Sequence, residues 1–82
     1  MEIIRGMVVC SKAGRDKDCF LVLMDTDGEY ASICDGKYRP LSNPKKKNLK
    51  HLSLTGTVLE EDSMETNCGL RKALKKFNDN KA

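Results

Sequence analysis

Short apolar runs separated by polar turns make up most of the first 60 residues. Residues 7–10 and 19–24 are apolar and residues 30–34 are mostly so; all three runs are too short for helices and rich in strand-forming side chains, so each predicts a strand. Asp27-Gly28 separates the second run from the third, and Asp35-Gly36 follows the third. Asp-Gly between apolar runs favours a tight hairpin turn, because glycine adopts positive φ without steric cost.

Two further strands are predicted after these turns. Residues 38–41 form a short fourth strand, limited by Pro40, which has no N–H to donate to a ladder. Residues 51–58 alternate polar and apolar positions, and Leu52, Leu54 and Val58 fall on one face of a half-buried fifth strand. Five short strands with tight turns predict a mostly β protein, with a small closed barrel that leaves few sheet edges.

The pattern changes to helical spacing near the C-terminus. Leu70, Ala73, Leu74 and Phe77 recur at this spacing, and Asn67 is the predicted N-cap. The basic residues of this segment lie on the opposite face, for which a solvated surface is the favoured interpretation. We expect one domain that consists of a β-barrel (residues 1–59), an acidic linker (60–66) and an amphipathic helix (67–78) packed on the barrel.

Composition narrows the class of protein. The chain has 82 residues and few aromatic side chains, so its core must be aliphatic. The four cysteines have neither zinc-ribbon nor redox spacing, and we expect Cys10, Cys19 and Cys34 to act as small core residues and no metal to be bound. Without a secretory segment or an apolar run of about 20 residues, the sequence predicts a cytoplasmic protein that does not enter membranes.

Positive charge is concentrated in one part of the chain. The formal net charge is only +3, but residues 37–51 contain no Asp or Glu. Such a window predicts a surface that faces a polyanion, with a solvated charged surface as the alternative. Because the lysine run (residues 45–50) contains no aromatic residue, we expect recognition of RNA backbone and shape rather than bases. Tyr38 is the only nearby candidate for base stacking, and a place in the core is the equal alternative for it. The candidate RNA-binding residues of this window are Lys37, Arg39, Lys45, Lys46, Lys47, Lys50 and His51.

The segment GMVVCSKAGRDK (residues 6–17) resembles a KOW motif, which consists of a strand, a glycine-centred loop and a second strand. Asp35-Gly36-Lys37, the lysine run, Lys50-His51-Leu52 and the LRKAL segment (70–74) also resemble large-subunit ribosomal proteins of the fourteen-e kind and their small bacterial relatives. This resemblance implies an SH3-like barrel that binds structured ribosomal RNA of the large subunit. Asp18 departs from the pattern, because glycine is expected there.

The residues of the KOW-like loop suit contact with phosphate. Gly14 permits close approach of an RNA backbone, although it is also a turn glycine. Ser11 offers a hydroxyl donor, and Lys12 and Lys17 add positive charge. Arg15 presents a planar fork for a phosphate or a base, with an ion pair to a neighbouring aspartate as the alternative.

Other functions are less well supported by the residues. A peptide-binding SH3-like module would need an aromatic-lined groove, for which this chain has few aromatic residues. A transcription-elongation accessory is a further alternative, because elongation factors also carry KOW motifs. His51 is the only histidine and has no nucleophile pattern around it, so we expect no catalytic residues, no cofactor and no small-molecule substrate. We expect a monomer whose partner is ribosomal RNA.

Overall fold

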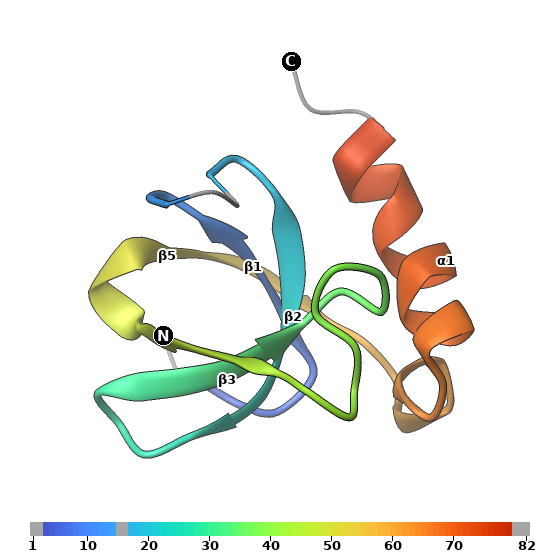
Figure 1. Cartoon of the computed structure of the whole chain (residues 1–82), viewed down its shortest axis with the longest axis horizontal. Coiled ribbons are helices and arrows are strands. Elements are labelled where there is room, and N and C mark those ends of the chain that lie inside the picture. Colours follow the sequence, from blue (N-terminus) through green and yellow to red (C-terminus); the bar gives the residue numbers. More distant parts are fainter. Residues whose placement is uncertain (1–2, 15–16, 80–82) are drawn as a thin grey trace.

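The chain forms a five-stranded sheet followed by a C-terminal helix, as seen in a computed structural model that describes residues 3–14 and 17–79 (Figure 1). This confirms the prediction of a mostly β protein with a C-terminal helix. Two short 3-10 helices, η1 and η2, flank the last strand. In chain order the elements are β1 (Met7–Ser11), β2 (Phe20–Thr26), β3 (Tyr30–Cys34), β4 (Lys45–Asn48), η1 (Leu49–His51), β5 (Leu52–Val58), η2 (Glu61–Met64) and α1 (Asn67–Asp79).

The strands are joined in the order β4-β3-β2-β1-β5, and each neighbouring pair is antiparallel. Val9 of the central β1 lies opposite Leu21 of β2 on one side and Leu54 of β5 on the other. The β2–β3 register shifts between Leu23 and Asp25, an irregularity of the kind that bends a strand and increases its twist. The two outer strands, β4 and β5, are connected by η1 alone.

The fourth strand is not where the pattern predicted it. Residues 38–41 form no strand; β4 is Lys45–Asn48, within the lysine run, and it pairs with β3. The backbone of this segment forms a loop closed by hydrogen bonds to Asp35 instead of a strand. Oδ1 of Asp35 accepts hydrogen bonds of 2.8 Å from the N–H groups of Lys37 and Arg39. The Arg39 carbonyl accepts one from the Asp35 N–H. Pro40 then has no N–H for a ladder.

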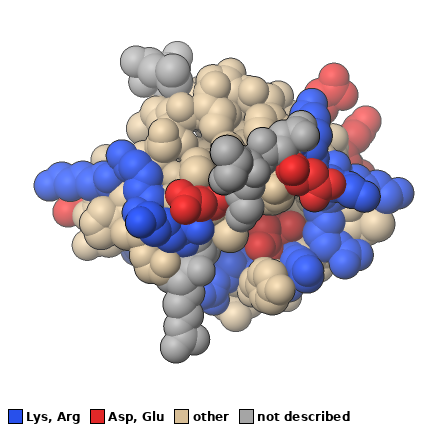
Figure 2. All heavy atoms as spheres, turned by 90° about the horizontal axis from the view of Figure 1, so that it is seen from above, with Lys and Arg blue, Asp and Glu red and all other residues tan. Residues whose placement is uncertain are grey.

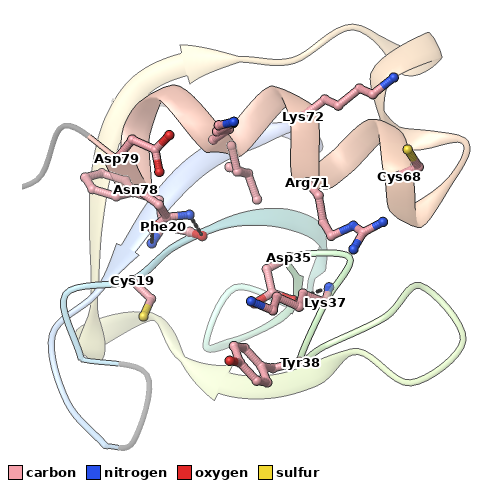
Figure 3. Close-up of a pocket in the computed structure, with 12 residues that line it drawn as sticks. Cys19, Phe20, Asp35, Lys37, Tyr38, Cys68, Arg71, Lys72, Asn78 and Asp79 are labelled. Atoms are coloured by element: carbon pink, nitrogen blue, oxygen red, sulfur yellow. Dashed lines mark hydrogen bonds between the residues drawn. The ribbon is translucent and has the colours of Figure 1, made fainter.

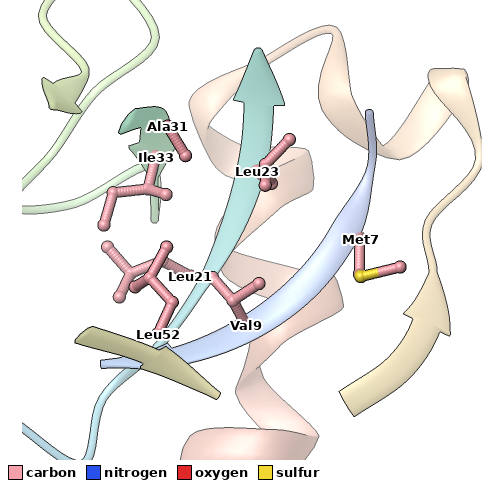
Figure 4. Packing of buried hydrophobic residues seen from close by; sticks show 7 residues of the cluster. All are labelled: Met7, Val9, Leu21, Leu23, Ala31, Ile33 and Leu52. Carbon is pink, nitrogen blue, oxygen red and sulfur yellow. The ribbon is translucent and has the colours of Figure 1, made fainter. Parts of the chain in front are cut away.

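Both faces of the central strands are buried. One face contributes an aliphatic cluster enclosed by the sheet (Figure 4), and the other face packs against α1 and η2. Burial on both faces explains why β2 is a continuous apolar run rather than an alternating one. The first cluster consists of Met7, Val9, Leu21, Leu23, Ala31, Ile33 and Leu52, and the second of Val8, Val22, Cys34, Met64, Leu70 and Leu74.

Helix α1 packs on the sheet through the stripe that its spacing predicted, and it ends one residue later than expected. Leu70 and Leu74 are buried, and the ring of Phe77 lies with its centroid 5.4 Å from that of Phe20. The N–H of Phe20 donates a hydrogen bond of 2.9 Å to Oδ1 of Asn78. Apolar packing and this bond together fix the C-terminal half of the helix against the start of β2.

The start of α1 is capped by Thr66, not by Asn67 as predicted. The Thr66 hydroxyl accepts a hydrogen bond of 2.9 Å from the N–H of Gly69, which is the usual N-cap pattern. The Asn67 side chain instead accepts a hydrogen bond of 2.8 Å from the N–H of Leu41. It therefore ties the β3–β4 connection to the helix. The predicted acidic linker contains η2, from which Met64 is buried in the second cluster.

The cysteines occupy different environments. Cys34 is buried, as predicted, and burial raises the pKa of its thiol. Cys10 and Cys19 are half-buried, and Cys68 is exposed. Across residues 3–14 and 17–79, no group of His, Cys, Asp and Glu side chains is arranged to hold a metal ion. No helix in the same ranges is both long and apolar enough to span a membrane.

Candidate nucleic-acid interface

The β1–β2 loop is closed tightly by backbone hydrogen bonds. The N–H of Ser11 donates to the Cys19 carbonyl at 2.9 Å, and the Ser11 carbonyl accepts from the Asp18 N–H at 2.8 Å. At the tip, the Gly14 carbonyl accepts a hydrogen bond of 3.2 Å from Lys17. Gly14 has φ of 84° and is exposed, so the loop adopts a backbone that glycine favours. Arg15, a candidate from the sequence, lies outside the described residues.

Asp18 adopts the conformation for which the sequence pattern expected glycine. Its φ is 69°, the only positive value for a non-glycine residue within residues 3–14 and 17–79. Aspartate is among the few L-residues that tolerate this region. Asp18 therefore takes a backbone conformation typical of glycine, and it adds an exposed negative charge beside the basic residues.

Lys47 of β4 points into the protein and fixes the β1–β2 loop. The residue is only 7% exposed, and its ammonium donates hydrogen bonds to the Ser11 hydroxyl, at 2.7 Å, and to the Ala13 carbonyl. The Ser11 hydroxyl in turn donates to the Ala13 carbonyl at 3.0 Å. Burying an ammonium costs free energy unless hydrogen-bond acceptors surround it, and this loop supplies them.

Ser11 and Lys47, which the sequence suggested as RNA ligands, thus have their side chains inside the molecule. Ser11 is fully buried, because it is paired with Leu52 in the β1–β5 ladder and faces the Lys47 ammonium. Neither side chain is presented to a ligand at the surface. Both hold the loop in place, which differs from the phosphate contacts that the sequence predicted for them.

Five of the predicted residues are exposed around this anchor, and we call them the loop surface: Lys12, Gly14, Lys17, Lys50 and His51. The N–H of Lys12 donates a hydrogen bond of 2.8 Å to the His51 carbonyl, which joins the loop to η1. Oδ1 of Asn48 accepts one of 2.9 Å from the Lys50 N–H and caps η1. Segments almost 40 residues apart in sequence therefore share one surface.

The other lysines of the run lie apart from the loop surface. Lys46 is exposed, but alternation along β4 turns it away from Lys47, and its ammonium lies 5.5 Å from the centroid of the Tyr30 ring. Lys45 is half-buried. The acid-free window that the sequence suggested as one surface is therefore divided by the sheet.

The remaining two candidates, Lys37 and Arg39, belong to the β3–β4 connection. Arg39 is half-buried, whereas Lys37 is exposed and lines an open cavity of about 640 Å³ between this connection and α1. We call this cavity the α1 groove. Figure 3 shows its two walls, with Asp35, Lys37 and Tyr38 on one side and Arg71 and Lys72 on the helix.

Sequence reasoning did not find the α1 groove. The sequence predicts the basic helix face, but it predicts a strand for the opposite wall and leaves Tyr38 open between the core and base stacking. Tyr38 is in fact 76% exposed. The signal that could have placed it is the Asp35-Gly36 turn, because a tight turn followed closely by Pro40 leaves little length for a strand.

Positive charge gathers in two regions of one face of the molecule. Figure 2 shows Lys and Arg side chains towards the side of η1 and again towards the side of α1, with acidic residues among them. In comparisons with known proteins, no family model matches this chain and no curated protein matches it.

Proposed function

We propose that this chain is a cytoplasmic RNA-binding protein of the KOW type that docks on structured RNA of the large ribosomal subunit through its loop surface. The role is one of binding, without catalysis, cofactor or metal, and it is carried out by a monomer. The resemblance of residues 6–17 to a KOW motif supplies the ligand class. The geometry around the β1–β2 loop supplies the contact region.

One observation carries the proposal. The buried ammonium of Lys47 holds the β1–β2 loop through the Ser11 hydroxyl and the Ala13 carbonyl. Only the end of the lysine-rich segment, at Lys50 and His51, thereby shares one surface with the KOW-like loop, to which the Lys12 N–H also bonds it. Residues that are already anchored, as Ser11 and Ala13 are here, lose less entropy on binding than free ones, so this anchor favours affinity for a rigid RNA.

The connection between the outer strands supports an SH3-like barrel as part of the proposal. Strands β4 and β5 lie at opposite edges of the sheet, yet the three residues of η1 join them. Three residues span at most about 10 Å, so the two edges must approach each other. A curled sheet of five short strands is the architecture that the KOW resemblance implies.

Contact is expected with the RNA backbone. Lys12, Lys17 and Lys50 are exposed cations that suit phosphates, and Gly14 has no side chain to hold an RNA strand away. The five residues of the loop surface include no Phe, Tyr or Trp, and the His51 imidazole is the one ring among them, so base stacking is a minor part of binding there. Binding of this kind releases counterions and weakens steeply as salt increases.

The test is sedimentation of a cell lysate through sucrose gradients at low and high salt, with detection of this protein by blotting. Co-migration with the large subunit at low salt and release at high salt is the expected result. The Lys12→Gln, Lys50→Gln double variant should leave the subunit at lower salt than the wild type, whereas Lys46→Gln should not. A protein that stays at the top of the gradient under both conditions contradicts the proposal and favours a protein-interaction or transcription role.

A further inference from the structure

We propose that the α1 groove is a second RNA site, which holds an unpaired nucleotide with its base against Tyr38 and its phosphate against the cations of α1. This inference rests on the proposed function, because it assigns part of the same RNA to a region outside the loop surface. Four features of the molecule support it: the exposed aromatic ring, the charge of the walls, the rigidity of the groove and the cations on the face shown in Figure 2.

The exposure of Tyr38 is the first observation. Its side chain is 76% exposed, the largest fraction among the exposed large apolar residues, although its ring lies at the edge of a cavity. A ring held open to solvent beside a cavity is available as a stacking platform, which is the usual way proteins bind unpaired bases. The ammonium of Lys37 lies over one face of this ring, 5.0 Å from the centroid, in a cation–π contact. A base that stacks on this face displaces the flexible lysine side chain, whose ammonium then suits the phosphate of the same nucleotide.

The charge of the groove is the second observation. Its lining includes four cations, Lys37, Arg71, Lys72 and Lys75, against two carboxylates. One of the carboxylates, that of Asp35, accepts two backbone hydrogen bonds of its own loop through Oδ1. Arg71 reaches from α1 towards the loop that carries Asp35 and Lys37 (Figure 3), so a guanidinium fork and an aromatic ring lie on facing walls. A guanidinium suits phosphate geometry, and an aromatic ring suits a base.

The third observation is that the walls are fixed relative to each other. The N–H of Leu41 donates to Oδ1 of Asn67, and Gly36 lies so close to the first turn of α1 that an added Cβ would overlap the Asn67 carbonyl. Phe20 and Asn78 hold the other end of the helix. A groove whose walls are locked by the fold needs no rearrangement to receive a ligand. Its volume of about 640 Å³ is also typical of a small-molecule site.

The fourth observation selects RNA over a protein partner. Lys and Arg side chains lie on both sides of the face that Figure 2 shows, so a polyanion lying across this face meets cations on both sides. A peptide site of this fold class uses several aromatic residues as a lining. This groove has one exposed ring with cations around it, a combination that matches the base and the phosphate of one nucleotide.

The first experiment compares two RNA probes: a short hairpin, and the same hairpin with an unpaired oligoadenylate extension. Binding to the purified protein is measured by fluorescence anisotropy at fixed salt. We expect the extension to strengthen binding by the wild type, Tyr38→Leu to abolish that gain, about fivefold or more, and Tyr38→Phe to retain it. Because the side chain is exposed, the variants should still fold, and unchanged binding of the plain hairpin verifies this.

The second experiment locates the base. The protein has two tyrosines, so NMR signals from labelled Tyr rings report separately on Tyr38 and on Tyr30, which serves as the internal control. Oligoadenylate should shift the Tyr38 ring protons upfield and leave those of Tyr30 unchanged. Polyglutamate of equal charge should not produce this shift; an equal shift overturns the RNA assignment in favour of an acidic peptide.

The results of these experiments can refute the α1 groove and the loop surface independently of each other. If the hairpin binds but the extension adds nothing and Tyr38 does not shift, the groove is refuted while the loop surface stands. If the extension strengthens binding equally in wild type and Tyr38→Leu, the extra contact lies elsewhere and the groove is again refuted. If the plain hairpin does not bind but oligoadenylate shifts Tyr38, the groove is supported as a single-strand site and docking through the loop surface fails.

Discussion

The ammonium of Lys47 lies inside the protein and donates a hydrogen bond of 2.7 Å to the hydroxyl of Ser11, a residue 36 positions earlier in the chain. This contact connects an edge strand of the sheet with the loop between β1 and β2. The lysine run therefore has two roles, because Lys47 stabilises the fold while the neighbouring Lys46 remains at the surface. The structural role of Lys47 can be separated from binding by measurements on the protein alone.

The first prediction concerns the free energy of unfolding. Ser11→Ala removes one acceptor from a buried ammonium, so it should destabilise the protein by about 1–3 kcal/mol in urea unfolding. Ser53→Ala, at an exposed position of β5, is the matched control and should cost less than about 0.5 kcal/mol.

A double-mutant cycle then tests the contact itself. In a Lys47→Met background the ammonium is gone, so Ser11→Ala should cost clearly less than in the wild type. A coupling energy of about 0.5–3 kcal/mol is expected for two residues in one hydrogen-bond network. An equal cost of Ser11→Ala in both backgrounds means that the hydroxyl stabilises the loop independently of Lys47.

The second prediction concerns the turn before the α1 groove. Gly36 has φ of 78°, and an added Cβ would overlap the Asn67 carbonyl and lie 3.1 Å from the Leu70 Cβ. Gly36→Ala should therefore combine backbone strain of about 1–2 kcal/mol with a steric clash of about 1–3 kcal/mol. The measurement is urea unfolding of the purified variant.

Gly28 provides a control with the same backbone restriction. Its φ is 98°, but an added Cβ would meet nothing within 4 Å. Gly28→Ala should therefore show the backbone strain without the clash, and the difference between the two variants measures the packing of the turn against α1. Equal destabilisation by the two substitutions would show that α1 moves away to admit the extra methyl group.

How far the sequence could predict this structure depended on whether a feature was local. The apolar runs of β1, β2 and β3 and the stripe of α1 follow from periodicity, because burial repeats at fixed spacing. Strand β4 could not be found in this way. Lysine has a low strand propensity, and the inward position of Lys47 depends on acceptors in a loop more than 30 residues away.

For the candidate site, too, the sequence predicted the local features and not those that depend on tertiary contacts. Exposure of Lys12 and Gly14 follows from the turn chemistry of their own segment. The joining of Lys12 to His51 and the facing of Tyr38 by Arg71 depend on tertiary packing, which periodicity does not contain. The cap of α1 was misplaced by one residue because Thr66 and Asn67 are both good N-cap residues, and a distant partner at Leu41 engages Asn67.

The third prediction concerns stability in acid. Hydrogen bonds from the N–H groups of Tyr30 and Glu29, at 2.8 and 2.9 Å, lower the pKa of Asp27 below its ordinary value of 3.8. A depressed pKa in the folded state means that the ionised carboxylate adds stability above pH 3.8. This contribution is lost as the pH falls through the lower pKa of the folded state.

Asp27→Asn keeps an oxygen acceptor for the turn but removes the ionisation. Its unfolding free energy should therefore fall less steeply than that of the wild type as the pH is lowered from about 5 towards 2. Asp62→Asn, on the exposed η2, is the matched control for loss of one negative charge. Parallel pH profiles of Asp27→Asn and the wild type would contradict a role for this carboxylate in acid unfolding.

The last prediction concerns the loop surface and salt. If Lys12 and Lys50 each neutralise one phosphate, replacing both with Gln should reduce the slope of log binding constant against log salt concentration by roughly 2. Filter binding of large-subunit ribosomal RNA over a range of salt concentrations gives this slope directly. Lys46→Gln removes the same type of charge from β4, but this side chain lies by Tyr30, so the substitution should leave the slope nearly unchanged. Equal reductions per lysine at all three positions would indicate a diffuse positive field instead of defined phosphate contacts, and the loop surface would lose its special role.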